Sequence, residues 1–172
     1  CIMGWGENAP GVSGRSEPLI AELAHSLPCD LLVFKDRGFD PAKILLPTTG
    51  GPHTDLAARV ARAFEDAFGS EITLLHVEDD LEKGRRFLDT WASEHGLGGA
   101  CQRIKTGSVE SAISSFEAEH TMILIGAAET GVLARLVRGS LTLEILHEVG
   151  CSVLIAETTT RRGIFERIFR LH

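Results

Sequence analysis

The sequence predicts an α/β protein with an open five-stranded parallel sheet, strand order 3-2-1-4-5, helices on both faces, and a partial second copy. Two observations support this fold class. From Lys43 onward, short apolar runs alternate with segments of helical periodicity, which is the pattern of β-α-β crossovers. In addition, residues 1–35 match residues 123–157 without a gap. A sheet of five parallel strands in a chain of this size most often takes the order given.

The repeat preserves an apolar run, a glycine, a polar loop, a helical pattern, a cysteine and a second apolar run, in that order. The identical pairs are Gly4/Gly126, Glu7/Glu129, Leu19/Leu141, Glu22/Glu144, His25/His147, Cys29/Cys151 and Leu32/Leu154. We therefore expect residues 1–36 to be the closing strand–helix–strand unit of a first domain, 37–42 a linker, and 43–157 a complete domain. A chain that opens directly on an apolar strand is expected to come from within a longer polypeptide.

The elements of the complete domain follow from their periodicity and their end signals. Strands are expected at 43–48, 71–77, 100–105, 121–126 and 151–157, and helices at 53–68, 81–95, 108–119 and 140–149. Thr54 is the predicted N-cap of the first helix, and Gly69 its end.

Composition excludes some partners. A net charge of −7 and a pI near 5.5 argue against nucleic acid, which favours a basic face. No apolar run approaches the roughly 18 residues of a membrane span, and no secretory signal is visible. The cysteines lack metal-type spacing, so we expect buried thiols in a cytoplasmic protein.

The order 3-2-1-4-5 places a ligand site where the winding reverses, between strands 1 and 4. The loops that meet there are Thr48–Pro52 and Gly126–Ser140. Gly126 after a strand and Gly139-Ser140 before a helix are suited to phosphate, with charge added by Arg135 and Arg138. The alternative is purely structural: Gly126 permits a turn and Ser140 caps its helix.

These motifs resemble the universal stress protein family over about residues 41–157. The matching segments are KILLPTTGGP at 43–52, LLHV at 74–77, TG at 106–107, ILIG at 123–126, GS at 139–140 and LHEVGCSVLI at 146–155. The resemblance implies an adenine-nucleotide alpha-hydrolase-like fold and, in some members, a site for ATP (with Mg) or AMP without strong catalysis. It implies these site residues: Pro47, Thr48, Thr49, Val77, Gly126, Arg135, Arg138, Gly139, Ser140 and Leu141.

Two residues depart from the family's nucleotide pattern. Glu129 stands at the second glycine of Gly-x2-Gly-x9-Gly-Ser, and Thr49 replaces the aspartate that meets the ribose. A carboxylate about 4 Å from a phosphate costs roughly 4 kcal/mol at an effective dielectric of about 20. A ligand-free interaction module is therefore the alternative to a nucleotide-binding one. In the first copy, Glu17-Pro18 replaces Gly139-Ser140, so that copy's site is expected to be lost.

The resemblance also implies partners. Family domains pair through their last strands, so we expect a homodimer or a tandem pseudo-dimer in which Asp30–Phe34 lies antiparallel to Ser152–Ala156. The segment TTGGPHTDLAA at 48–58 resembles stress domains fused behind amino-acid permeases and other transporters, which would tether the module to the inner face of a membrane. The basic, amphipathic tail at 158–172 is suited either to an anionic membrane surface or to docking on protein.

No catalytic constellation is visible, and we expect no enzyme; weak ATP hydrolysis remains an alternative. His76 is interpreted as a hydrogen-bonded strand histidine. Glu78, Asp79 and Asp80 either hold a divalent ion with a nucleotide or form a solvated helix start. The function that these observations favour is a regulatory or sensor module of a larger protein.

Overall fold

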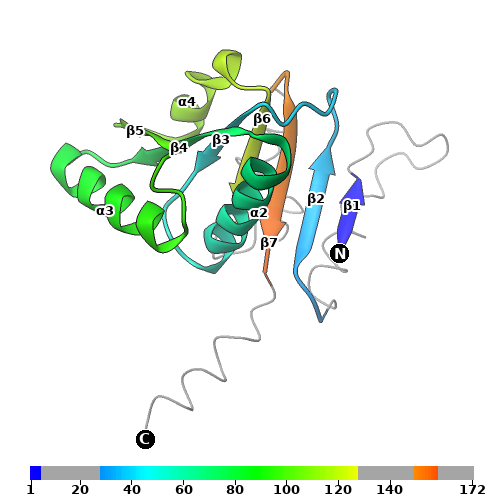
Figure 1. Ribbon diagram of the computed structural model, residues 1–172. Helices are drawn as coiled ribbons and strands as arrows, with labels where there is room; N and C mark the ends of the chain where they lie inside the picture. Colours follow the sequence, from blue (N-terminus) through cyan, green and yellow to red (C-terminus); the bar gives the residue numbers. More distant parts are fainter. Residues whose placement is uncertain (5–27, 128–148, 159–172) are drawn as a thin grey trace, which may run out of the picture.

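The computed structural model describes residues 1–4, 28–127 and 149–158, and Figure 1 shows their arrangement. In this part of the chain one sheet has the strand order β1-β2-β7-β6-β3-β4-β5. The strands are β1 (Ile2–Gly4), β2 (Leu31–Lys35), β3 (Lys43–Pro47), β4 (Glu71–Val77), β5 (Cys101–Lys105), β6 (Met122–Gly126) and β7 (Ser152–Glu157).

The five strands of the predicted domain form the parallel part of this sheet. Read from its β5 end, the order β5-β4-β3-β6-β7 is the predicted 3-2-1-4-5, and every pair within it is parallel. The sheet is larger than the predicted five strands because β2 adds antiparallel to β7, and β1 adds parallel to β2. The segments that the sequence analysis expected to pair antiparallel therefore do so within one chain.

The sequence repeat is also a repeat of strand register. Ile2 pairs with Leu32 between β1 and β2, and their counterparts Leu124 and Leu154 pair between β6 and β7. Gly4 likewise pairs with Phe34, as Gly126 pairs with Ala156. The two copies therefore have the same local backbone pairing as well as similar residues.

Two core layers lie on opposite faces of the sheet. Helices α2 (Pro52–Phe68) and α3 (Leu81–Glu94) cover one face, where Leu56, Leu88 and Trp91 pack on alternate side chains of β3, β4 and β6. Helix α4 (Val109–Ser114) and the 3₁₀ turn η1 (Glu117–Glu119) lie on the other face. This is the predicted division of helices between two faces (Figure 1).

Two predicted helix boundaries were wrong. The N-cap of α2 is Gly51, not Thr54, because Pro52 has no N–H to lose in the first turn and its fixed φ suits the start of a helix. The hydroxyl of Thr54 instead donates to the Gly51 carbonyl at 2.9 Å. Helix α4 ends at Ser114, before the expected Glu119, where the Ser115 hydroxyl donates to the Ala112 carbonyl and competes with the helical pattern.

The expectation of buried cysteines was also wrong. Cys1, Cys29 and Cys101 are exposed, and Cys151 is half-buried. Cys29 and Cys151, which precede β2 and β7, lie near opposite ends of the β2–β7 ladder. The antiparallel pairing of Leu31 with Glu157 and of Lys35 with Val153 places the start of each strand opposite the end of the other. The predicted helix at 140–149, except for its last residue Val149, and the tail from residue 159 lie outside the described residues.

Candidate functional site

The carboxyl ends of β3, β4 and β6 share one edge of the sheet. Because β3 lies between β4 and β6, the loop after β3 is flanked by the loops after the other two strands. Successive connections turn in opposite directions from β3, which is the condition for a ligand crevice at this edge.

The β3–α2 loop is held by backbone interactions and by one hydroxyl. Thr48 is buried, its N–H donates to the Leu75 carbonyl at 2.8 Å, and its hydroxyl accepts from the Gly50 N–H at 3.2 Å. Gly50 and Gly51 have φ values of 81° and 95°, which side-chain-bearing residues rarely adopt. The loop thus buries Thr48 and leaves Thr49 exposed at the edge.

His76 of the neighbouring strand β4 holds this loop in place. The buried imidazole donates its Nδ1–H to the Thr48 carbonyl at 2.8 Å and stacks on Phe87 with ring centroids 4.4 Å apart. A Cβ at Gly50 would lie 3.4 Å from the same Phe87 ring. His76 is therefore the hydrogen-bonded strand histidine that the sequence analysis favoured, and its role is to position the loop.

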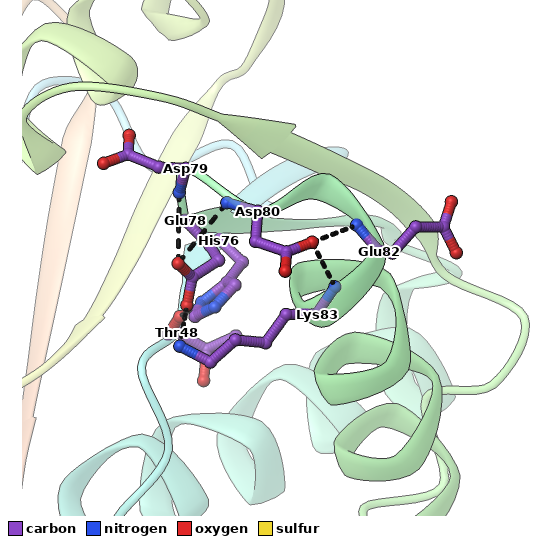
Figure 2. Close-up of polar contacts among 7 residues, drawn as sticks. All are labelled: Thr48, His76, Glu78, Asp79, Asp80, Glu82 and Lys83. Atoms are coloured by element: carbon purple, nitrogen blue, oxygen red, sulfur yellow. Dashed lines mark hydrogen bonds and ion pairs between the residues drawn. The ribbon is translucent and has the colours of Figure 1, made fainter.

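The acidic run after β4 begins helix α3. Asp80 is the N-cap, accepting from the N–H groups of Glu82 and Lys83 at 3.0 and 3.1 Å. Glu78 accepts from the Asp79 N–H and forms a 2.6 Å ion pair with Lys83. Figure 2 shows the Asp80 carboxylate turned toward the start of α3 and the Glu78 carboxylate toward Lys83, whereas the Asp79 carboxylate points away from both, so the three do not face a common centre. The helix-start interpretation is the one these contacts support, and the described residues contain no metal-binding group of three or more His, Cys, Asp or Glu.

The pKa values of this ion pair are displaced in opposite directions. Hydrogen bonding from Lys83 is the main cause that lowers the pKa of Glu78, and hydrogen bonding to Glu78 is the main cause that raises the pKa of Lys83. The Lys83 side chain is exposed and Glu78 is half-buried beside it, so the pair widens the pH range over which both side chains are charged but, being open to solvent on the lysine side, adds little stability.

Gly126 has a packing role at this edge. A Cβ there would lie 2.6 Å from the Thr54 backbone nitrogen and 2.7 Å from the His53 carbonyl carbon. The first turn of α2 can therefore rest on the end of β6 only because residue 126 is glycine. Neither alternative raised by the sequence, a phosphate approach or a tight turn, included this contact between two backbones.

Sequence reasoning also missed a polar cluster beside the end of β7. The Thr158 N–H donates to Nδ1 of His53 at 3.0 Å, and the Thr158 hydroxyl donates to Oδ1 of Asp30 at 2.7 Å. Oδ2 of Asp30 accepts from Arg59 of α2 at 3.2 Å. The cluster joins Asp30 of the first repeat copy to helix α2 and to the residue that follows β7, and isolated polar residues at such sequence distances carry no periodic signal that would predict it.

The structure brings together those predicted site residues that it describes. Pro47 and Thr48 are buried at the end of β3, Thr49 is exposed beside them, and Gly126 ends the neighbouring β6. Val77 ends β4, half-buried against the core on the α4 face. Arg135, Arg138, Gly139, Ser140, Leu141 and Glu129 lie outside the described residues.

A separate polar hollow of about 430 Å³ lies at the opposite, amino edge of the sheet. Its lining includes Lys43, Glu71, Arg103, Phe116 and His120. Since it lies at the starts of β3, β4 and β5, it is remote from the edge where the predicted site residues meet.

No helix among the described residues is long and apolar enough to cross a membrane.

Comparison with solved structures identifies the fold. The class is an α/β protein with the nucleotide-hydrolase-like parallel sheet, and the neighbours are universal stress proteins. One from Archaeoglobus fulgidus superposes with a TM-score of 0.62 at 17% identity, covering 93% of this chain and 62% of the other. A universal stress protein in complex with cAMP gives 0.56 at 16% identity, covering 70% of this chain and 100% of the other.

A second structure from Archaeoglobus fulgidus gives a TM-score of 0.51 at 16% identity, covering 67% of this chain and 93% of the other. The chain spans 62% of the length of the first Archaeoglobus protein. No protein-family model matches the chain, and no curated protein matches it. At 16–17% sequence identity, the similarity to these solved structures is a similarity of fold.

Proposed function

We propose that this protein is a regulatory or sensor module of the universal stress protein type, with a site for an adenine nucleotide such as ATP or AMP at the carboxyl edge of β3, β4 and β6. The observation that carries the proposal is the construction of that edge. Thr48 is fixed by Leu75 and His76, so that Thr49 is left exposed, and the turn is completed by two glycines with positive φ. The fold likeness to a universal stress protein in complex with cAMP supports it.

Each residue of the site has a proposed role. Thr49 offers a hydroxyl to the ribose, and Val77 contacts the adenine. Gly126 begins the loop that leads to Gly139 and Ser140, which the family resemblance assigns to the phosphates. Arg135 and Arg138 supply compensating charge, and Mg accompanies ATP.

Binding without efficient turnover is part of the proposal. The Nδ1–H of His76 donates to the Thr48 carbonyl, and the Asp80 carboxylate accepts from the backbone N–H of Glu82 at the start of α3. Glu78 is paired with Lys83. A general base would need a carboxylate or imidazole free to face the nucleotide, and these nearby side chains are engaged elsewhere. Phosphate release from ATP no faster than in buffer would agree with this, and release that saturates with ATP would contradict it.

The nucleotide proposal is tested by thermal unfolding with ATP, AMP and cAMP. A ligand at about 100 times its Kd stabilises by about 2.7 kcal/mol, or roughly 5–10 °C for a chain of this size. No shift with any of the three nucleotides would overturn the proposal. Glu129→Gly tests the charge at the second glycine position: an affinity gain of up to about a thousandfold is expected if that carboxylate faces phosphate.

Thr49→Asp tests the ribose contact separately. A carboxylate is a stronger acceptor than a hydroxyl, so ATP should bind more tightly to this variant, whereas an analogue that lacks the ribose hydroxyls should not. Thr90→Asp, at another exposed threonine, on α3, is the matched control. Equal effects of the two substitutions would remove Thr49 from the proposed site.

The second candidate function is a ligand-free interaction module, and the β2–β7 pairing favours it. Five antiparallel residue pairs join the two repeat copies, so the outer edge of β7 is occupied within the chain. Of a homodimer and a tandem pseudo-dimer through these strands, the pairing supports the tandem form. A monomer by light scattering is then expected, and a stable dimer without nucleotide would favour the homodimer.

The cellular setting is proposed from the sequence. We place the module in the cytoplasm as part of a larger protein such as a transporter, held at the inner face of the membrane. The basic tail at 158–172 is then suited to anionic lipid. Flotation with phosphatidylserine vesicles, lost when Arg161, Arg162, Arg167 and Arg170 become Gln, is expected; flotation equal to that with neutral vesicles would contradict it.

A further inference from the structure

The polar hollow of about 430 Å³ at the amino edge of the sheet lies on the face that carries α4. Its floor is formed by the starts of β3, β4 and β5, and its wall by the segment from Phe116 to His120. Helix α4 has only six residues, so the chain leaves the helix at Ser115 and continues through the short turn η1 beside this edge. Because the proposed nucleotide site lies at the opposite edge, this amino-edge hollow is a separate candidate for binding.

The floor of the amino-edge hollow is polar, whereas the middle of the same sheet face is apolar. Leu45 and Leu75, at 0% and 1% exposure, belong to the core cluster of the α4 face. Side chains two positions apart on a strand point to the same face, and the residues two positions before these leucines are Lys43 and Thr73. Cys101, the strand partner of Thr73, is exposed. The apolar core therefore stops short of this edge, and the hollow offers polar groups to a ligand.

Four charged side chains on this lining form no ion pair within the part of the chain that the structure describes: Lys43, Arg103, Glu71 and Glu119. Lys43 and Glu71 are direct partners in the β3–β4 register. Opposite charges at such cross-strand positions attract each other, yet these two are not within the 4.0 Å of an ion pair. By contrast, Arg62 on α2 pairs with both Glu65 and Asp66. Two positive and two negative groups thus line one hollow without neutralising each other.

An aromatic ring and an imidazole nitrogen complete the lining. Phe116 belongs to the core of the α4 face, and its ring lies edge-to-face with His120, with centroids 6.4 Å apart. Nδ1 of His120 lies 2.7 Å from the Phe116 carbonyl oxygen, which can only accept, so Nδ1 carries the proton. Nε2 of the neutral ring is then an acceptor, and within the described residues it has no hydrogen-bond partner.

We propose that the amino-edge hollow binds a short peptide of two or three residues with free termini. Arg103 and Lys43 receive its terminal carboxylate, which the guanidinium fork can hold in bidentate fashion. The carboxylates of Glu71 and Glu119 and the Nε2 of His120 receive its terminal ammonium. An apolar side chain of the peptide packs on Phe116.

The separation of the charges favours a peptide over simpler ligands. The opposite charges of the lining stand apart, and the termini of a peptide are likewise separated by its length. A ligand of one sign, such as phosphate, would be repelled by two carboxylates on the same lining. The volume of about 430 Å³ lies within the range of roughly 300–1,000 Å³ that is usual for small-molecule sites.

Alkylation of Cys101 by iodoacetamide tests the proposal, because this thiol is exposed and lies on the lining. The peptide is alanyl-leucine, and site-resolved mass spectrometry measures the rate. At about ten times its Kd, about one site in eleven stays free, so alkylation of Cys101 should slow by about tenfold. Alkylation of the exposed Cys29 should not change. No protection up to the solubility limit of alanyl-leucine would overturn the proposal, as would equal protection by the N-acetylated, C-amidated peptide, which lacks both charges.

Two charge variants test the roles of the lining. Arg103→Gln and Glu71→Gln each remove one charge at an exposed position, so the fold should be kept and melting temperatures should show it. Each should raise the peptide concentration for half-protection by about tenfold, relative to the variant's own rate without peptide. Arg86→Gln, at an exposed arginine of α3 on the other face, is the matched control. Unchanged half-protection in both lining variants, or an equal loss in Arg86→Gln, would overturn the proposal.

Discussion

Val33 and Ile155 pair at the centre of the antiparallel β2–β7 ladder, and each is the counterpart of the other in the sequence repeat. The flanking pairs are related in the same way: Leu31 with Glu157 on one side is matched by Lys35 with Val153 on the other. A local two-fold relationship therefore passes between Val33 and Ile155, exposed by 2% and 1%. The two copies are joined at a buried position, and this makes the junction part of the core.

The first prediction concerns the cooperativity of this junction. Ile155→Ala should lower the free energy of unfolding by about 2–5 kcal/mol, as is usual when a core isoleucine is truncated. Val33→Ala removes less volume and should cost less, but it should shift the same single transition, because both side chains belong to one core cluster. Chemical denaturation followed by fluorescence and by circular dichroism measures both effects.

A double-mutant cycle provides the control for this prediction. Neighbouring core residues usually show coupling of about 0.5–3 kcal/mol, and Val33 and Ile155 should fall in that range. If Val33→Ala moved a separate early transition and left the main one in place, β2 would be an appendage rather than part of the core.

The second prediction concerns the contact between β6 and the start of α2. Gly126→Ala should destabilise the protein by about 1–3 kcal/mol, because the added methyl overpacks a backbone that cannot rotate away. The control is Gly98→Ala, where the added methyl meets nothing within 4 Å. Thermal melts of the two variants should differ by several degrees, and equal melting temperatures would show that α2 can shift at little cost.

The sequence predicted those parts of the molecule that periodicity and repetition encode. Buried strands such as Lys43–Pro47 and Glu71–Val77 and the winding order followed from the alternation of elements. The role of Gly126 and the Asp30–Thr158 bond did not, because each depends on a contact between segments distant in sequence. The start of α2 was misplaced for a local reason: a threonine that resembles a cap competes with a proline at the first helical position.

The candidate site was predictable to a similar extent. The edge that bears Thr48, Thr49 and Gly126 follows from strand order alone. That His76 would hold the Thr48 carbonyl, and that Asp80 would be used as a cap, requires the positions of side chains in space. The sequence can identify His76 and Asp80 as candidate functional residues. Only their hydrogen-bond partners in the folded protein show whether the side chains are free for catalysis or hold a loop or helix in place.

The third prediction concerns the half-buried thiol of Cys151. Burial, with the neighbouring Glu117 carboxylate as a second cause, raises the pKa of Cys151 above its ordinary value. Only the thiolate reacts with alkylating agents, so Cys151 should be modified more slowly than the exposed Cys29 at mildly alkaline pH. Site-resolved mass spectrometry over a pH series measures both rates.

Glu117→Gln is the informative variant for this thiol. It removes the negative charge and keeps an oxygen that can accept from the Gly150 N–H, as Glu117 does. The pKa of Cys151 should fall, and its alkylation should begin at lower pH, while the profile of Cys29 stays fixed. If Cys151 were unaffected, burial alone would account for its slow reaction.

The fourth prediction concerns the N-cap of α3. Asp80→Ala removes the acceptor for two backbone N–H groups and should cost about 1 kcal/mol. Asp80→Asn keeps an oxygen acceptor and should recover most of that stability. If Asp80→Ala instead stabilised the protein, the acidic run would be a strained cluster kept for binding, and the interpretation of this loop as a helix start would be wrong.

The last prediction concerns the pH response of the Glu78–Lys83 pair. Because the pKa of Glu78 is lowered in the folded protein, its contribution to stability is fully present above the ordinary pKa of a glutamate, which applies to the unfolded chain, and is lost as pH falls through the lower pKa of the folded protein. Lys83→Met should therefore raise the pKa of Glu78 toward its ordinary value, as measured by the carboxyl chemical shift in an NMR titration. The change in stability at neutral pH should be small, since the Lys83 side chain is exposed and the ion pair is screened by solvent. Arg85→Met, which removes another exposed cation of α3, is the control and should leave the titration of Glu78 in place. Equal shifts in the two variants would mean that the general field of the helix, rather than the 2.6 Å contact with Lys83, sets the pKa of Glu78.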